Sequence, residues 1–596
     1  MNNFRKIITT SKKKIETQGI KHFFKSAAEK IKRNEFYIKE ATSLDLKKDS
    51  EMVQVENNSD PYKIWISKNE LTEKELKERY KTMKLDYRPL ISILVPVFNP
   101  PAKILKEAIQ SVRNQIYENW ELCITNGSTD SSIREILDDM AKSDSRIIVM
   151  HTTNMGISEN TNLANSNSKG EFIALLDHDD SLSPNALLEI ARALDANPKI
   201  DFIYSDSDKI TEEGERFEPF FKPDWSPELM LSSNYAAHLC VIRKKLVDAV
   251  GGFKSEMDGA QDWDLILRVT EKSNNVLHIP KVLYHWRIMR NSTAIDMTTK
   301  PYALNAQIVA VTNFLHRKGV NSYITHGPSL YLRCKIYQDK PRVSIIIPVI
   351  DDLKNAEICI NSLRNNTEYP NFELILVGNV DTEQHLHEIE KRYDNIKIIS
   401  SSKYNNIPTA LNAGSSFASS ELLVFFDSRL RAIEKGWLAE MSGWFHIDNI
   451  GCVGSKLINT NGVIQHAGII IGHDGEPHYV FNGIKENSRF WCPFGAQDWY
   501  RNYNAVSGKC MMIKKKIFEE IGGFQSLNTN YDIDLCLRIR ERGYRILFTP
   551  YSRLCYDESM ETRSKINPNQ HGARVDMNDC YYSPNLSTDS VTTLRL

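Results

Sequence analysis

The sequence lacks the features by which several large classes of protein are recognised. Its 75 basic and 76 acidic residues leave a formal net charge of −1, so no overall positive field attracts nucleic acid. It has no run of about 18 apolar residues, the length that spans a bilayer, and no apolar segment follows the N-terminus as in a signal peptide. The 10 cysteines form no C-x-x-C pair, which indicates a reducing compartment. We expect a cytoplasmic protein without a nucleic-acid partner.

The first 36 residues form a basic stretch with apolar residues at helical spacing. Six apolar side chains at i, i+3, i+4, i+7, i+8 and i+11 share one helix face: Ile20, Phe23, Phe24, Ala27, Ala28 and Ile31. Such a helix lies peripherally on the cytoplasmic face of the plasma membrane, or it packs on the following domain or a partner protein. Both readings stay open at this point, as does the oligomeric state.

The 596 residues are enough for two or three domains, each with its own core. The apolar, β-branched run within Arg88–Pro101 predicts a buried strand, and strand-like segments at 120–125, 146–150 and 171–177 alternate with segments of helical period. This alternation predicts an α/β fold with a Rossmann-like, mostly parallel sheet covered by helices.

The pattern of strands and loops occurs twice. "ISILVPVFN" at Ile91 recurs as "VSIIIPVID" at Val343, 252 residues later, and "QDWDLILR" recurs as "YDIDLCLR" after 270 residues. Near-constant offsets over such a length predict two homologous domains in tandem. We therefore expect a basic helical region, a first domain, a linker, a second domain and a C-terminal tail at residues 1–85, 86–330, 331–341, 342–575 and 576–596.

The loop "LDHDDSLSP" predicts a metal site. Asp177, Asp179 and Asp180 follow a buried strand, at the sheet edge where ligands of open α/β sheets bind. Close carboxylates repel one another unless a cation is present, and hard oxygen ligands suit Mn²⁺ or Mg²⁺. An acidic loop that only caps the next helix is the alternative.

Polar loops at the ends of neighbouring strands predict a slot for a nucleotide. They lie at Pro96–Pro100, Thr125–Asp130 and Asn154–Ala164, and they combine a flat apolar ring with a tight turn and several amides. The candidate contacts are Pro96, Phe98, Asn126, Ser128, Asn162 and Asp177. Neither G-x-G-x-x-G nor a P-loop follows the first strand, so a dinucleotide or P-loop site is unsupported.

Two further residues complete the candidate chemistry. Asp262 begins the helical pattern "QDWDLILR", where it is either a helix cap or a general base beside a bound diphosphate. His285 lies at the end of the predicted strand "HIPKVLYHWR". It is either a structural histidine or a nitrogen ligand of the same cation.

In this order, the motifs "PVFN", "NGSTD", "LDHDD", "QDWDL" and "LYHWR" resemble those of family 2 glycosyltransferases of the GT-A fold. The stretch from Tyr62 to Ser587 is similar to bacterial two-domain transferases of O-antigen, capsule and rhamnan synthesis. The resemblance implies an inverting hexosyl or rhamnosyl transfer from a UDP- or dTDP-linked sugar to a lipid-linked oligosaccharide or polysaccharide. It also implies Asp262 as the base and His285 as a ligand of the Mn²⁺ or Mg²⁺ held by the acidic loop.

The second copy differs at the metal positions. Asp427 is retained, but Arg429 stands where the first copy has Asp179, and a guanidinium cannot be a metal ligand. Asp532 matches the candidate base. We expect transfer activity to be lost or severely weakened here. The alternative is a bifunctional enzyme in which Arg429 faces the diphosphate.

Two other classes of protein fit the whole chain less well. A sugar nucleotidyltransferase would need a glycine-rich phosphate loop after the first strand, and "PVFNPP" is a poor substitute. A non-catalytic glycan-binding scaffold would explain the second domain, but it leaves the acidic loop of the first without a purpose.

Overall fold

The computed structural model describes residues 60–81, 83–289, 301–327, 329–337, 339–350, 353–472, 475–488, 491–525, 530–558, 560, 579–588 and 590–596. Pro61–Leu596 form one compact unit. The basic helix expected in residues 1–36 lies outside the described residues. Within the described ranges, none of the helices combines the length and the apolar composition that crossing a bilayer requires.

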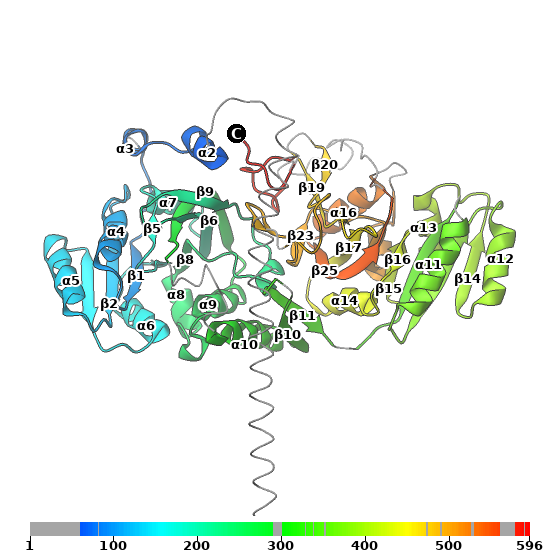
Figure 1. The fold of residues 1–596 in the computed structure, drawn as a ribbon, viewed down its shortest axis with the longest axis horizontal. Coiled ribbons are helices and arrows are strands. Elements are labelled where there is room, and N and C mark those ends of the chain that lie inside the picture. Colours follow the sequence, from blue (N-terminus) through cyan, green and yellow to red (C-terminus); the bar gives the residue numbers. More distant parts are fainter. Residues whose placement is uncertain are drawn as a thin grey trace, which may run out of the picture. The chain divides into compact units, whose positions relative to one another are not determined.

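The first half of the chain contains a nine-stranded sheet in the order β3-β2-β1-β4-β8-β6-β9-β5, with β7 beside β6 (Figure 1). Its strands are β1 Ile91–Val97, β2 Trp120–Asn126, β3 Ile147–His151, β4 Phe172–Leu175, β5 Ser181–Leu182, β6 Phe202–Ile210, β7 Arg216–Phe220, β8 Cys240–Arg243 and β9 Val276–Arg287. The helices of this half are α2 Pro61–Asn69, α3 Glu73–Tyr80, α4 Ala102–Arg113, α5 Ser131–Ser143, α6 Ile157–Asn167, α7 Ala186–Ala196, α8 Lys244–Ala249, α9 Gln261–Thr270 and α10 Pro301–Arg317. A two-stranded ribbon follows, β10 Ser322–His326 with β11 Leu332–Ile336.

The second half contains a ten-stranded sheet in the order β14-β13-β12-β15-β24-β17-β25-β16, with β18 beside β17 and β23 beside β25. Its strands are β12 Val343–Val349, β13 Phe372–Gly378, β14 Ile396–Ser400, β15 Leu422–Phe426, β16 Arg431–Ala432, β17 Ile450–Ile458, β18 Ile464–His466, β23 Arg501–Tyr503, β24 Cys510–Lys514 and β25 Arg545–Cys555. Two short ribbons pair β19 Ile469–Ile471 with β20 Pro477–Tyr479 and β21 Trp491–Cys492 with β22 Gly495–Ala496. The helices are α11 Leu353–Asn365, α12 Glu383–Arg392, α13 Ile407–Phe417, α14 Trp437–Gly443, α15 Lys515–Glu520 and α16 Tyr531–Glu541.

The predicted α/β fold with two tandem sheets is confirmed. We refer to β1–β9 with their helices as the first domain and to β12–β25 with theirs as the second domain. Both domains begin with a strand whose two faces are buried, β1 and β12. Each pairs in parallel with two neighbours, and this explains why its residues are apolar in succession rather than in alternation.

The antiparallel strand β8 brings together the residues of the candidate site. β8 lies between β4 and β6 and runs antiparallel to both. Its register places Phe172 opposite Arg243 and Leu175 opposite Cys240. Because of this register, the residues just before Cys240 lie beside the residues that follow Leu175. The acidic loop therefore meets a segment more than 50 residues later in the chain.

Candidate active site

The loops after β1 and β4 and the start of α6 surround a pocket of about 480 Å³. Pro96 and Phe98 line it from the end of β1, Asp177 and Asp179 from the acidic loop, and Trp286 from the end of β9. Phe98 keeps 45% of its surface exposed and thus presents a flat apolar face to a ligand. The pocket lies beyond the carboxyl ends of the parallel strands β1 and β4, where the sequence predicted a site.

The acidic loop is anchored at Asp180, which is 1% exposed. Its carboxylate accepts the O–H of Tyr284 and the main-chain N–H of Arg287, the latter at 2.7 Å. Both donors belong to β9, so this strand holds the loop at its last residue. Burial, and then the charges of Asp177 and Asp179, raise the pKa of Asp180 well above its usual range.

A histidine that sequence reasoning did not select joins this loop. One nitrogen of His238 and one carboxylate oxygen each of Asp177 and Asp180 lie within 4.8 Å of one another. The imidazole ring stacks on Tyr284, with ring centroids 4.7 Å apart. Burial, and then the positive charge of Lys222, lower the pKa of His238 to about 3. The imidazole is therefore neutral, which is the form that binds a metal.

The structure places His285 on the other side of β9. Tyr284 faces the acidic loop and Trp286 faces the pocket, so His285 between them points away, because side chains alternate along a strand. Its Nδ1 lies 2.6 Å from Oδ1 of Asp208. The other oxygen of this carboxylate, Oδ2, accepts the O–H of Tyr62 at 2.7 Å. His285 lines a separate pocket of about 310 Å³ beside α2 and α3. The fold thus brings it together with Asp208 and not with the group of Asp177, Asp180 and His238.

Asp262 lies in the first turn of α9 and reaches the candidate site. It lines a small cavity of about 60 Å³ together with Asp177 and His238. The Nδ2 of Asn234 donates to its Oδ2 at 2.9 Å, and the main-chain N–H of Trp263 donates to its Oδ1 at 2.8 Å. Burial raises the pKa of Asp262, although both hydrogen bonds oppose the shift. A raised pKa makes this carboxylate a better proton acceptor near neutral pH.

Three of the predicted nucleotide contacts make hydrogen bonds within the protein. Oδ1 of Asn126 accepts the N–H of Ser128 at 3.0 Å, and Oγ of Ser128 accepts the N–H of Asn99 at 2.9 Å. Asn162 donates to the carbonyl of Phe253 and accepts its N–H, both at 2.9 Å. These side chains fix the turns around the site. Of the predicted set, Pro96, Phe98 and Asp177 line the 480 Å³ pocket.

In the second domain, basic side chains neutralise the equivalent loop. Both carboxylate oxygens of Asp427 accept hydrogen bonds from Arg429, at 2.8 and 2.6 Å, and Lys509 donates to one of them at 3.4 Å. Lys509 takes the place of His238. Lys509 lies five residues before the end of β24, which pairs antiparallel with β15, and His238 lies five residues before the end of β8, which pairs antiparallel with β4. Burial alone would raise the pKa of Asp427, but Arg429 and Lys509 lower it.

The counterpart of the candidate base is enclosed by main chain. Asp532 is 1% exposed, and its carboxylate accepts the N–H of Gly508 at 2.6 Å and that of Ile533 at 2.9 Å. A Cβ added at Gly508 would lie 2.8 Å from the Cβ of Asp532, so the chain passes directly over this side chain. Asp262, in contrast, remains partly exposed.

Comparisons with known proteins find the same duplication. The family model for glycosyl transferase family 2 matches residues 92–251 and again residues 344–522. The O-antigen biosynthesis protein RfbC of Myxococcus xanthus is 32% identical over 492 residues, which cover 81% of this chain and 38% of that protein. The uncharacterized protein y4gI of Sinorhizobium fredii is 35% identical over 537 residues, which cover 85% of this chain and 58% of that protein. The chain thus spans less than two thirds of either relative.

Among solved structures, the S. aureus TarS fragment 1–349 in complex with UDP-GlcNAc is similar to part of the chain. The identity is 18% and the TM-score 0.31, over 38% of this chain and 69% of that one.

Proposed function

The chain belongs to glycosyl transferase family 2, and from this membership we propose that it is an inverting transferase acting on a growing cell-surface polysaccharide. The donor in this proposal is a UDP- or dTDP-linked sugar, and the acceptor is a lipid-linked oligosaccharide or polysaccharide. The similarity to RfbC, whose name refers to O-antigen biosynthesis, supports this class of acceptor. We assign the transfer to the first domain.

The observation that carries the proposal is the shared cavity of Asp262, Asp177 and His238. An acceptor hydroxyl that enters there attacks the anomeric carbon of the donor sugar, and the bond from that carbon to the diphosphate oxygen breaks on the opposite face. Asp262 takes the hydroxyl proton, and its raised pKa suits this role. Asn234 holds the carboxylate in position during the transfer.

We further propose that Asp177, Asp179, Asp180 and His238 hold Mn²⁺ or Mg²⁺. The residues present fit such an ion, because the set combines carboxylate oxygens with a neutral imidazole and contains a buried carboxylate whose ionisation needs a counter-charge. When bound, the ion supplies positive charge that stabilises the departing nucleoside diphosphate. His238 replaces His285 in this set, since His285 is bonded to Asp208 on the other side of β9.

For the nucleoside we propose the pocket beside Phe98. Its exposed ring offers a stacking surface for a base, and the side chains of Asn154 and Asn160 line the same pocket. Asn126, Ser128 and Asn162 then act as supports that keep the surrounding turns in place.

The test is a screen of nucleotide sugars for release of nucleoside diphosphate in the presence of a lipid-linked acceptor. We expect one donor to be turned over by the wild type, and Asp262→Asn to bind that donor without transferring its sugar. EDTA should abolish turnover and Mn²⁺ should restore it. Near-normal turnover by Asp262→Asn would remove Asp262 as the base, and unchanged turnover in EDTA would remove the metal.

A further inference from the structure

The segment of residues 220–238 connects the candidate active site of the first domain with the second domain. At its far end, Asn234 donates to Asp262, and His238 joins Asp177 in the candidate metal group. At its near end and along its length, it contacts residues of the second domain. A change in how this segment is held would therefore reach both the base and the metal group.

Lys222 ties the beginning of this segment to its end. It is 1% exposed, and its Nζ donates to the carbonyls of Ala237 and His238, both at 2.6 Å. Its own main-chain N–H donates to Oδ1 of Asp206 in β6 at 2.8 Å. His238 has a φ of 52°, a left-handed conformation that residues other than glycine keep only where their surroundings hold it. Lys222 provides such a hold.

The residues next to Lys222 are attached to the second domain. The main-chain N–H of Phe221 donates to the carbonyl of Pro493 at 2.8 Å. The ring of Phe220 lies 5.2 Å from that of Trp491 and 5.8 Å from that of Trp499, measured between centroids. The main chain beside Lys222 is thus held by the second domain, in addition to the hydrogen bond of Lys222 to Asp206.

The middle of the segment is attached as well. Glu228 is 2% exposed and forms an ion pair with Arg545 at 2.6 Å. Two further hydrogen bonds cross between the domains, from Ser226 Oγ to Asn502 Oδ1 at 2.7 Å and from the N–H of Tyr500 to Ser232 Oγ at 2.9 Å.

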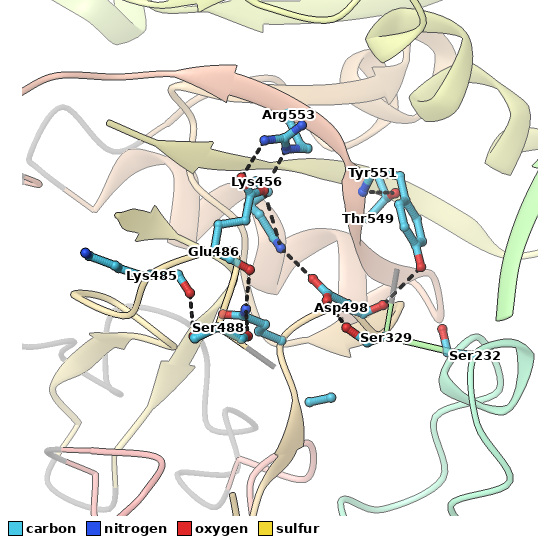
Figure 2. Close-up of polar contacts among 12 residues, drawn as sticks. Ser232, Ser329, Lys456, Lys485, Glu486, Ser488, Asp498, Thr549, Tyr551 and Arg553 are labelled. Carbon is cyan, nitrogen blue, oxygen red and sulfur yellow. Dashed lines mark hydrogen bonds and ion pairs between the residues drawn. The ribbon is translucent and has the colours of Figure 1, made fainter. Parts of the chain in front are cut away.

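The part of the second domain that makes these contacts is itself fixed, and Figure 2 shows one of its anchors, Asp498. The carboxylate of Asp498 accepts hydrogen bonds from Lys456 at 3.0 Å and from Ser329 at 2.9 Å, and its carbonyl accepts the O–H of Tyr551 at 3.4 Å. Lys456 is 1% exposed and Asp498 is half-buried, so the ion pair between them is largely shielded from solvent. Residues on both sides of Asp498 therefore present a firm surface to the 220–238 segment.

We propose that the second domain serves the transfer reaction as an internal support: it holds the 220–238 segment, so that Lys222 positions His238 and the attachments of Ser226, Glu228 and Ser232 position Asn234. Lys222 is a positioning residue in this scheme, since it acts on His238 through hydrogen bonds to the main chain. The inference rests on the proposed function of the first domain. It also gives the second domain a purpose that needs no substrate of its own.

The first experiment replaces Lys222 by methionine in the full chain. Lys222→Met removes the two hydrogen bonds to the main chain and keeps a long side chain in the space. We expect amide hydrogen exchange of residues 233–240 to become about tenfold faster. We also expect Mn²⁺ affinity, measured by electron paramagnetic resonance without donor, to fall by about 10- to 100-fold. Exchange in β12 and β13 should stay as in the wild type, which shows that the chain is folded.

The second experiment makes the change in the other domain. Trp491→Ala truncates a side chain that is 38% exposed and contacts the ring of Phe220 at a tilt, so we expect the chain to fold. We expect faster exchange in residues 220–240 and a lower kcat, with less effect on the KM of the donor. The matched control is Phe417→Ala, an aromatic side chain of the same domain that is 57% exposed and lies outside the contacts described here. It should match the wild type.

The outcomes separate this inference from the proposed function. Unchanged exchange of residues 233–240 in both Lys222→Met and Trp491→Ala overturns the support role, whatever the activity. If exchange rises as expected but the wild type binds no Mn²⁺, the metal of the proposed function fails and the support role stands. If Phe417→Ala has the same effect as Trp491→Ala, the effect is general loosening, and the inference is overturned.

Discussion

After the fourth parallel strand of each large sheet, the first domain carries Asp177 and Asp179 beside His238, and the second carries Asp427 between Arg429 and Lys509. The first group combines carboxylates with an imidazole, whereas the second group contains the positive charges of Arg429 and Lys509 beside its carboxylate. Burial, and then the charges of Asp177 and Asp179, raise the pKa of Asp180, whereas Arg429 and Lys509 lower the pKa of Asp427 against the effect of its burial. The same sheet edge therefore accommodates a loop with several carboxylates in one domain and, in the other, a loop whose carboxylate is neutralised by basic side chains.

The two domains share the hydrogen bonds that hold a turn near this sheet edge. Asn162 bonds both main-chain groups of Phe253, and Asn412 bonds both groups of Phe524 at 2.8 and 2.9 Å. In each domain the phenylalanine is preceded by a glycine with a positive φ, and a Cβ on that glycine would lie 2.6 Å from the asparagine oxygen. The turn is thus present in both domains, although the side chains of the two acidic-loop positions differ.

The comparison is tested most strongly at the two candidate bases. Asp262→Asn should lower kcat by about 10³-fold, within the range that general bases contribute, because the acceptor proton loses its acceptor. Asp532→Asn should leave turnover close to that of the wild type, since Asp532 is enclosed by main chain. Nucleoside diphosphate release measures both. Complete loss of activity in Asp532→Asn would show that the second domain is catalytic.

The next largest difference concerns metal binding at equivalent positions. Mn²⁺ at about 100 times its Kd should stabilise the wild type by about 2.7 kcal/mol, seen as a rise in Tm. Asp177→Ala should lose this rise, whereas Asp427→Ala, compared with its own metal-free Tm, should keep it. A rise that survives Asp177→Ala, or that disappears in Asp427→Ala, would place the ion elsewhere.

The two loops should also respond to pH in opposite directions without metal. The pKa of Asp180 is raised in the folded protein, so the stability falls as the pH rises from about 4 through that folded pKa. The pKa of Asp427 is lowered in the folded protein, so its contribution to stability is present above about pH 4 and is lost as the pH falls. At pH 7 we expect Asp180→Asn to stabilise by roughly 1–2 kcal/mol and Asp427→Asn to destabilise by a similar amount. Denaturant unfolding at pH 7 and pH 4 measures both. Equal signs at pH 7 would contradict the assigned charges.

The smallest contrast should be found at the shared asparagines. Asn162→Ala and Asn412→Ala each remove two hydrogen bonds to the main chain, and each should cost about 1–2 kcal/mol of unfolding free energy. The KM for the donor should change little in either variant. If Asn162→Ala instead raised that KM tenfold with little loss of stability, Asn162 would be a nucleotide contact, as the sequence predicted.

Local patterns were enough to predict the fold, because buried parallel strands and their helices have strong periodic signals. Asp177, Asp180 and Asp262 were selected for a similar reason, since each lies at the end of a predicted element, and their roles stay predictions. His238 was missed because its place depends on the antiparallel register of β8, which no local pattern reveals. His285 was selected from its motif, but strand alternation turns it toward Asp208.

The asparagine side chains also have positions in the site that a local sequence pattern does not reveal. Asparagine at a loop is compatible with binding a base or with holding a turn, and only the three-dimensional partners distinguish the two. For Asn126 and Asn162, those partners are main-chain and side-chain groups of the protein itself.

The ion pair of Glu228 and Arg545 has a consequence for biosynthesis, because its members are 317 residues apart. At about 5–20 residues per second, the chain needs roughly 15–60 s after making Glu228 to supply its partner. Until then the carboxylate stays hydrated and the segment that carries Asn234 and His238 lacks its outer attachment. In a nascent chain this attachment of the 220–238 segment can therefore form only late in translation.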